Sequence, residues 1–118
     1  MSDITRYDTT VRRSRYVVFN KVVYLGGQTP TSRSAPIEQQ TAEVLAKVDE
    51  LLAHAGTSKE RLLTTQIFLA DITRDFAGMN KVWDAWTPPG ATSTRATVQA
   101  SLANPEIHIE MVVTAALP

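Results

Sequence analysis

The chain has 118 residues, enough for about one domain, and 43% of them are hydrophobic, as expected of a folded protein. Twelve Lys and Arg residues balance twelve Asp and Glu residues, so no net charge attracts nucleic acid or an anionic membrane. The absence of cysteine excludes disulfides, thiol catalysis and thiolate metal sites. The polar N-terminal stretch suggests neither a signal peptide nor a membrane anchor. We therefore expect a single cytoplasmic domain, residues 1–118, without nucleic-acid or membrane partners.

The first predicted elements are two short strands in residues 16–27, "YVVFNKVVYLGG", joined by a turn at Asn20-Lys21. The Gly26-Gly27 pair that follows permits unusual backbone angles and lets a ligand approach the main chain closely. Residues 28–36 then form a loop rich in Pro, Ser and Thr. Three arginines precede the first strand, and we expect them to form a solvated edge: Arg12, Arg13 and Arg15.

Two helices and a strand are predicted in the middle of the chain. Apolar residues recur at three- and four-residue steps between Pro36 and Gly56, and these two residues suit the two ends of a helix. Residues 61–70, "RLLTTQIFLA", predict a largely buried strand. A second helix begins near Asp71 or Thr73 and ends at "TPPG". Its apolar positions are those expected of a core-facing helix: Phe76, Met79, Val82, Trp83 and Trp86.

Residues 94–113, "TRATVQASLANPEIHIEMVV", alternate between polar and apolar and predict a final antiparallel hairpin. A hairpin loop with an even number of residues would place Arg95 and Glu110 on one face, opposite each other or one diagonal step apart. The residues expected to face the core are Ala96, Val98, Ala100, Ile107, Ile109 and Met111. The residues expected on the other face are Arg95, Thr97, Gln99, His108 and Glu110.

The charged pair on this face has two interpretations. On an exposed sheet, Arg95 and Glu110 would form a surface ion pair worth less than about 1 kcal/mol. If a second subunit covered the face, the pair would be desolvated and would form a site. A metal site is not expected, because His54 and His108 lie on different elements without the spacing of paired ligands. The "GGQTP" loop also lacks the lysine of a phosphate-binding loop.

Several motifs occur together in the order found in one family. These are "YLGGQTP", the helix that ends in "HAG", the "LAD" strand end, the "FAGMN" helix, "TRATV" and "IHIE". From about Arg13 to Leu117 the chain resembles the reactive intermediate deaminases, the Rid or YjgF family. The resemblance implies a chorismate-mutase-like α+β fold of order ββαβαββ, with two helices on one face of a mixed sheet. It also implies a homotrimer with active sites between subunits.

The resemblance also assigns roles to individual residues. Arg95 matches the arginine that binds a substrate carboxylate, and Glu110 matches the acid that positions or activates water. Four further positions match substrate-binding residues of the family: Tyr16, Gly27, Asn80 and Thr97, the last through its backbone N–H. The chain departs from well-known members at Ser14-Arg15, where they have Gly-Pro, and in a shorter connection before Arg95. These departures affect the mouth of the pocket and leave the substrate open.

The implied activity is hydrolysis of enamines or imines such as 2-aminoacrylate to a 2-keto acid and ammonia, without metal or cofactor. A planar guanidinium suits a carboxylate, and a carboxylate suits a water molecule. Two alternatives remain open: a pathway-specific enamine deaminase of the aminomuconate type, and a protein that binds small keto acids without useful turnover. A ribonuclease or translation-inhibitor role has been attached to family members, but zero net charge provides no electrostatic affinity for RNA.

Overall fold

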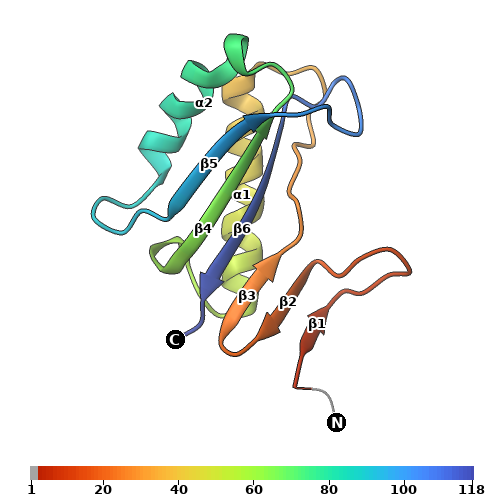
Figure 1. The fold of residues 1–118 in the computed structure, drawn as a ribbon, viewed down its shortest axis with the longest axis vertical. Helices are drawn as coiled ribbons and strands as arrows, with labels where there is room; N and C mark the ends of the chain where they lie inside the picture. Colours follow the sequence, from red (N-terminus) through yellow and green to blue (C-terminus); the bar gives the residue numbers. More distant parts are fainter. Residues whose placement is uncertain (1–2) are drawn as a thin grey trace.

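The structure, a computed structural model, describes residues 3–118 as a six-stranded sheet with two helices on one face (Figure 1). The strand order is β1-β2-β3-β6-β4-β5, and all neighbours are antiparallel except β4 and β5. The α+β class with two helices on a mixed sheet is thus confirmed. The elements in chain order are β1 Thr5–Tyr7, β2 Tyr16–Phe19, β3 Val22–Leu25, α1 Ile37–Ala55, a short 3-10 turn Lys59–Arg61, β4 Leu62–Leu69, α2 Ile72–Trp86, β5 Thr94–Gln99 and β6 Ile109–Ala116.

The predicted turn between the first two long strands is confirmed. Asn20 and Lys21 connect β2 to β3 with φ angles of 51° and 60°. Positive φ at both central residues is the requirement of a type I′ hairpin turn, and asparagine tolerates it better than most residues. The strand β1, which pairs with β2, was not predicted, because its sequence "TRY" is short and polar.

Both predicted helices are confirmed, together with the residues that end them. Gly56 follows α1 with φ at 94°, and the N–H groups of Gly56 and Thr57 bond the carbonyls of Ala53 and Leu52. Asp71 caps α2, because its carboxylate accepts the backbone N–H of Arg74 at 3.1 Å. No helix within residues 3–118 is long and apolar enough to cross a membrane.

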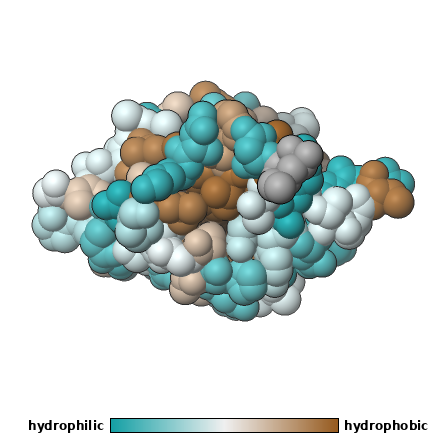
Figure 2. Space-filling model, turned by 90° about the horizontal axis from the view of Figure 1, so that it is seen from below, coloured by the Kyte–Doolittle hydropathy of each residue, from teal (hydrophilic) through white to brown (hydrophobic). Residues whose placement is uncertain are grey.

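The core lies between the helices and one face of the sheet, where β6 and β4 are central. From Thr65 to Leu69 strand β4 buries alternate residues rather than most of them, because its other face has no helix over it. At the end that carries the β2–β3 turn and the C-terminus, hydrophobic side chains gather in a hollow between hydrophilic ones (Figure 2). The fully buried core residues on β4, α1, α2 and β6 include Val44, Leu45, Leu52, Ile67, Leu69, Met79, Ile109 and Met111.

The predicted final hairpin is wrong, because β4 lies between β5 and β6. Strand β5 runs parallel to β4, which α2 makes possible as the crossover connection. The face assignment of β5 is consequently reversed: Val98 is 47% exposed on the face without helices, and Ala96 is exposed as well. The core positions predicted on the last strand and just before it, Ile107, Ile109 and Met111, are confirmed.

Candidate functional site

Arg95 lies at the free edge of the sheet on the face that carries the helices. Its register partner on β4 is Thr65, which is buried beneath them. The Arg95 Nη1 donates to Asn80 Oδ1 on α2 at 2.7 Å, and its guanidinium carbon lies 5.6 Å from the centre of the Trp83 ring. A cation over an indole ring is stabilised by the ring's quadrupole. Only one of the five N–H donors of this guanidinium is used within residues 3–118, so the others can bind an anion.

Thr97 lies two residues along β5 on the same side as Arg95. The backbone groups of successive strand residues point to opposite sides, and the N–H of Ala100 bonds to Leu69 O on β4 at 3.0 Å. Residues of the other parity, including Thr97, therefore direct their N–H groups away from the sheet. The Thr97 Oγ1 is also buried and has no hydrogen-bond partner in the described part of the chain. This strand edge thus offers a guanidinium and free backbone donors side by side.

Glu110 lies on β6 beside a break in the ladder that joins β6 to the residues after β3. Tyr24 pairs with Thr114, and Gln28 pairs with Met111. The four residue steps from Tyr24 to Gln28 therefore lie opposite only three steps on β6, from Thr114 to Met111. The extra residue forms a bulge at Gly26-Gly27. A Cβ placed on Gly27 would collide with the Glu110 Oε2, which shows that the carboxylate lies directly against the Gly27 backbone.

The two halves of the predicted site lie apart in one chain. Arg95 pairs with Thr65 and Glu110 with Phe68, three positions along β4 and of opposite parity. The two side chains therefore leave opposite faces of the sheet. Their Cα atoms are separated by two strand spacings, roughly 10 Å, and by about 10 Å along the strands. The expectation that both lie on one face of a hairpin is wrong.

Tyr16 does not join either half. It is 7% exposed, its hydroxyl bonds His54 Nδ1 at 2.9 Å, and its ring stacks on Tyr7 at 4.9 Å between centroids. Burial and the neighbouring Tyr7 raise the pKa of Tyr16. These contacts link β1 and β2 to the end of α1, and they give no support to the substrate-binding role predicted for Tyr16.

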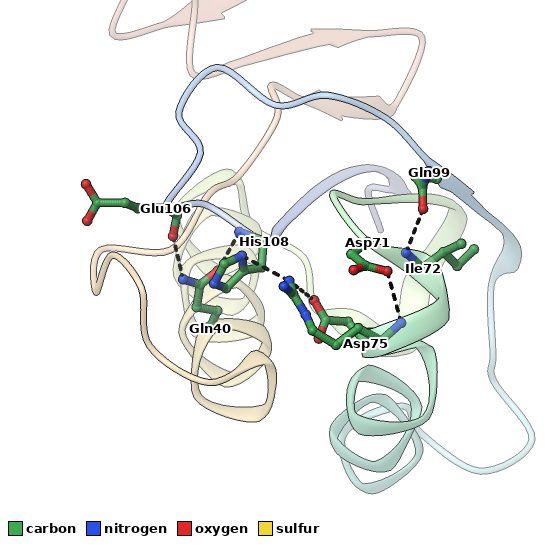
Figure 3. Close-up of polar contacts among 8 residues, drawn as sticks. Gln40, Asp71, Ile72, Asp75, Gln99, Glu106 and His108 are labelled. Atoms are coloured by element: carbon green, nitrogen blue, oxygen red, sulfur yellow. Dashed lines mark hydrogen bonds and ion pairs between the residues drawn. The ribbon is translucent and has the colours of Figure 1, made fainter.

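The second histidine belongs to a network that sequence reasoning did not find (Figure 3). The Gln40 side chain is fully buried, donates to Glu106 O and accepts the backbone N–H of His108 at 2.8 Å. The His108 ring faces Arg74, which forms a bidentate pair with Asp75. The network fixes the segment that leads into β6, two residues before Glu110. The signal available in the sequence was a glutamine at an inward-facing position of α1.

Residues 3–118 bring no three His, Asp or Glu side chains together as metal ligands. His54 and His108 serve the two separate polar networks described above. Trp83 was assigned only to the core, although it also lies under the Arg95 guanidinium. Its position three residues after Asn80, on the same side of α2, is the signal that would have linked it to the site.

Comparisons with known proteins agree with this architecture. The family model described as Endoribonuclease L-PSP matches residues 4–117. The RutC family protein YoaB of Escherichia coli K12 is 42% identical over 114 residues, which cover 97% of this chain and 98% of that protein. The crystal structure of a YjgF-family protein from Neisseria meningitidis superposes with a TM-score of 0.94 at 41% identity, over 98% of this chain and 96% of that chain.

A more distant relative, Reactive Intermediate Deaminase A of Arabidopsis thaliana, is 28% identical over 109 residues, covering 92% of this chain and 58% of that protein. The match to the family model extends along almost the whole of the present chain, from β1 to β6. The chain therefore belongs to the Rid, or YjgF, family.

Proposed function

We propose that this protein is an enamine/imine deaminase that hydrolyses small 2-imino acids to 2-keto acids and ammonia. The observation that carries the proposal is the Arg95 guanidinium, anchored by Asn80 and Trp83 at a strand edge with its remaining donors free. Such a planar fork matches a carboxylate, and the adjacent N–H of Thr97 matches a second oxygen. The name of the Arabidopsis relative is consistent with this chemistry.

We further propose that the active site is assembled from two copies of the chain in a homotrimer. One chain directs Arg95 and Glu110 to opposite faces of its sheet, so they act together only if a neighbour supplies one of them. The face without helices carries exposed apolar side chains, including Tyr24 and Val98, and suits contact with a second copy. Light scattering that gives a monomer at micromolar concentration would remove this part of the proposal.

The reaction needs few groups. Arg95 holds the α-carboxylate, and Glu110 of the neighbouring copy accepts a proton as the water oxygen bonds to the imine carbon. This proton passes to the nitrogen. A second proton moves from the new hydroxyl to the nitrogen as the C–N bond breaks, which leaves a 2-keto acid and ammonia. An enamine substrate first tautomerises to the imine.

The direct test is an assay in which an amino-acid oxidase or a dehydratase generates the imine and keto-acid release is followed. The proposal predicts faster release with the wild type and loss of this acceleration with Arg95→Ala and with Glu110→Gln. An Arg95→Ala variant as active as the wild type would refute it. Calorimetry that detects keto-acid binding without any acceleration would instead identify a binding protein.

A further inference from the structure

A cavity of about 360 Å³ lies where the segment before β2 meets α1 and the loop after β3. Its side chains are polar or charged, and none belongs to an aliphatic or aromatic residue. Three cationic side chains against one carboxylate leave an excess of positive charge, which favours an occupant with about two negative charges. The lining residues are Arg13, Arg15, Gly26, Gly27, Gln28, Thr29, Lys47 and Glu50.

The fold does not use the two guanidinium groups of this cavity. Within residues 3–118, neither Arg13 nor Arg15 forms an ion pair or a side-chain hydrogen bond. Arg15 is nevertheless half-buried, and partial burial of a cation without a partner is unfavourable. Lys47 differs, because its amine donates to Thr29 O at 2.7 Å. The sequence predicted a solvated edge for the arginines, but the structure places these two in the wall of a concave site.

The backbone that carries both arginines is held in place. The Arg15 N–H bonds to Tyr7 O at 2.8 Å, and its carbonyl accepts the Gly26 N–H at 3.0 Å. The Thr10 N–H bonds to Arg13 O at 2.7 Å, and this bond closes a turn. The cationic groups are therefore presented by a fixed frame, which reduces the ordering cost of binding an anion.

A phosphate monoester matches the charge of this cavity better than a carboxylate does. A carboxylate carries one negative charge, whereas a phosphate monoester carries about 1.5 to 2 at pH 7. Guanidinium groups bind phosphate oxygens in pairs, and a lysine adds a point charge. The volume of about 360 Å³ lies at the small end of the range of roughly 300–1,000 Å³ found for small-molecule sites. It exceeds the space that a phosphate ion fills, so a short attached chain can enter with the phosphate.

The remaining lining residues indicate that the attached chain carries hydroxyl groups. In the described part of the chain, neither the Glu50 carboxylate nor the Thr29 hydroxyl has a hydrogen-bond partner. A carboxylate repels phosphate but accepts hydrogen bonds from hydroxyl groups, and a threonine hydroxyl can donate or accept. Because the lining contains no aliphatic or aromatic residue, a hydrocarbon chain would gain little by entering.

The cavity and the Glu110 carboxylate lie on different sides of the sheet. Lys47 and Glu50 line the cavity from α1, on the face that carries the helices. Glu110 leaves the face without helices and lies against the Gly27 backbone from that side. The Gly27 backbone therefore separates the two, and a ligand in the cavity does not occupy the place of an imine substrate.

We propose that this cavity is a binding site for a small phosphorylated sugar or polyol, separate from the proposed active site. Arg13 and Arg15 bind the phosphate group, and Lys47 adds a third positive charge. Glu50 accepts hydrogen bonds from the hydroxyl groups of the ligand. This inference goes beyond the proposed deaminase function and does not depend on it.

The test is calorimetry with ribose 5-phosphate as the probe, compared with ribose and with inorganic phosphate. The wild type should bind ribose 5-phosphate, should bind inorganic phosphate roughly tenfold more weakly, and should not bind ribose detectably. Arg13→Gln/Arg15→Gln should weaken binding of ribose 5-phosphate roughly 100-fold, because a charged interaction is lost at each position. The matched control Arg6→Gln/Arg12→Gln removes two exposed arginines outside the cavity and should bind like the wild type.

Glu50→Gln tests the assignment of the hydroxyl groups separately from that of the phosphate. Removal of the negative charge should tighten the binding of inorganic phosphate, because a repelling group is lost. The preference for ribose 5-phosphate over inorganic phosphate should shrink at the same time, because an amide is a weaker acceptor than a carboxylate. An unchanged preference would overturn the role of Glu50 in binding hydroxyl groups.

Three results would overturn the site. The first is no binding of ribose 5-phosphate to the wild type, or equal weakening in the two double-arginine variants. The second is inorganic phosphate binding as tightly as ribose 5-phosphate, which would identify an adventitious ion only. The third is displacement of ribose 5-phosphate by 2-oxobutanoate, which would place the cavity within the keto-acid site. The expected binding in a protein that fails to hydrolyse imines would support the site while the deaminase function fails.

Discussion

Arg95 and Glu110 are supported by the chain in different ways. Arg95 rests on Trp83 and donates to Asn80, so its position is set by contacts from α2. Glu110 has no hydrogen bond or ion pair from its carboxylate to any residue of 3–118, and a glycine backbone is what lies against it. One half of the site is therefore prepared to hold a charge at a fixed point. The other half leaves a carboxylate free to hold water.

Among substitutions that leave both site residues charged, the largest effect is expected from Arg95→Lys, which keeps the charge but removes the planar fork. A lysine offers a point charge in place of two parallel N–H bonds. Because each charged hydrogen bond is worth about 1.5–3 kcal/mol, kcat/KM for imine hydrolysis should fall roughly 100-fold. Steady-state assays measure the change. A lysine variant within about threefold of the wild type would show that Arg95 does not grip a carboxylate through its fork.

The Glu110 half is tested by Gly27→Ala, with Gly26→Ala as its matched control. A methyl group on Gly27 collides with the Glu110 carboxylate, whereas one on Gly26 meets carbonyl oxygens at 3.5 and 3.6 Å, which are ordinary contacts. Displacement of the carboxylate should lower kcat by about tenfold in Gly27→Ala, less than the roughly 100-fold or more expected when general acid–base assistance is lost completely, because the carboxylate is shifted and not removed. Equal activity of the two variants would contradict the placement of Glu110 against Gly27.

Tyr16→Phe distinguishes a core role from a site role. The substitution removes the hydrogen bond to His54 and keeps the stacked ring. The free energy of unfolding should fall by about 1 kcal/mol, as for a typical hydrogen bond, while kcat/KM stays unchanged. Urea unfolding and the imine assay provide the two readouts. A tenfold loss of activity at unchanged stability would restore the predicted substrate role of Tyr16.

The smallest effect concerns Glu43, which holds the loop that follows Gly27. Hydrogen bonds from Ser32 and Gln39 lower the pKa of the Glu43 carboxyl from 4.5 to about 2. The pKa of Glu43 is lower in the folded chain than in the unfolded chain, so the ionised carboxylate stabilises the fold. This stabilisation is present above pH 4.5 and is lost as the pH falls toward 2. The difference in melting temperature between wild type and Glu43→Gln should shrink over this range. A difference that is constant with pH would exclude the linkage.

Local signals in the sequence were sufficient for much of the fold. Pro36 and Gly56 bracketed α1, Asp71 capped α2, and Asn20-Lys21 formed the expected turn. In each case the deciding physics lies within a few residues, since a cap or a turn depends on local hydrogen bonds and backbone angles.

Long-range pairing was not predictable in the same way. The alternation of residues 94–113 fits a hairpin, but it fits equally well two strands separated by β4. The helix between β4 and β5 was the evidence for a parallel crossover. The apolar parity of β5 was assigned to the core, yet Val98 lies on the face without helices. The alternation of residues along a strand indicates which face of the strand is apolar, but it does not indicate whether a helix or another subunit covers that face.

In the candidate site, too, single residues were easier to predict than the long-range arrangement that surrounds them. Arg95 and Thr97 lie on one side of β5 and Asn80 contacts Arg95, while the substrate-binding roles that the family resemblance implied for them stay predictions. The contact of Gly27 with Glu110 was not predicted, and Tyr16 is buried in the core of its own chain. The cavity beside Arg13 and Arg15 depends on how β1 and β2 meet the segment after β3, and no local motif encodes that arrangement.

The most direct test of the two-copy site is complementation between Arg95→Ala and Glu110→Gln. Each variant alone should be inactive. When the two are unfolded together and refolded in equal amounts, random trimers contain intact sites at some of their interfaces, and about a quarter of the wild-type activity should return. The double variant Arg95→Ala/Glu110→Gln, mixed with either single variant, should restore none. No recovered activity in verified mixed trimers would contradict a site built from Arg95 of one copy and Glu110 of another.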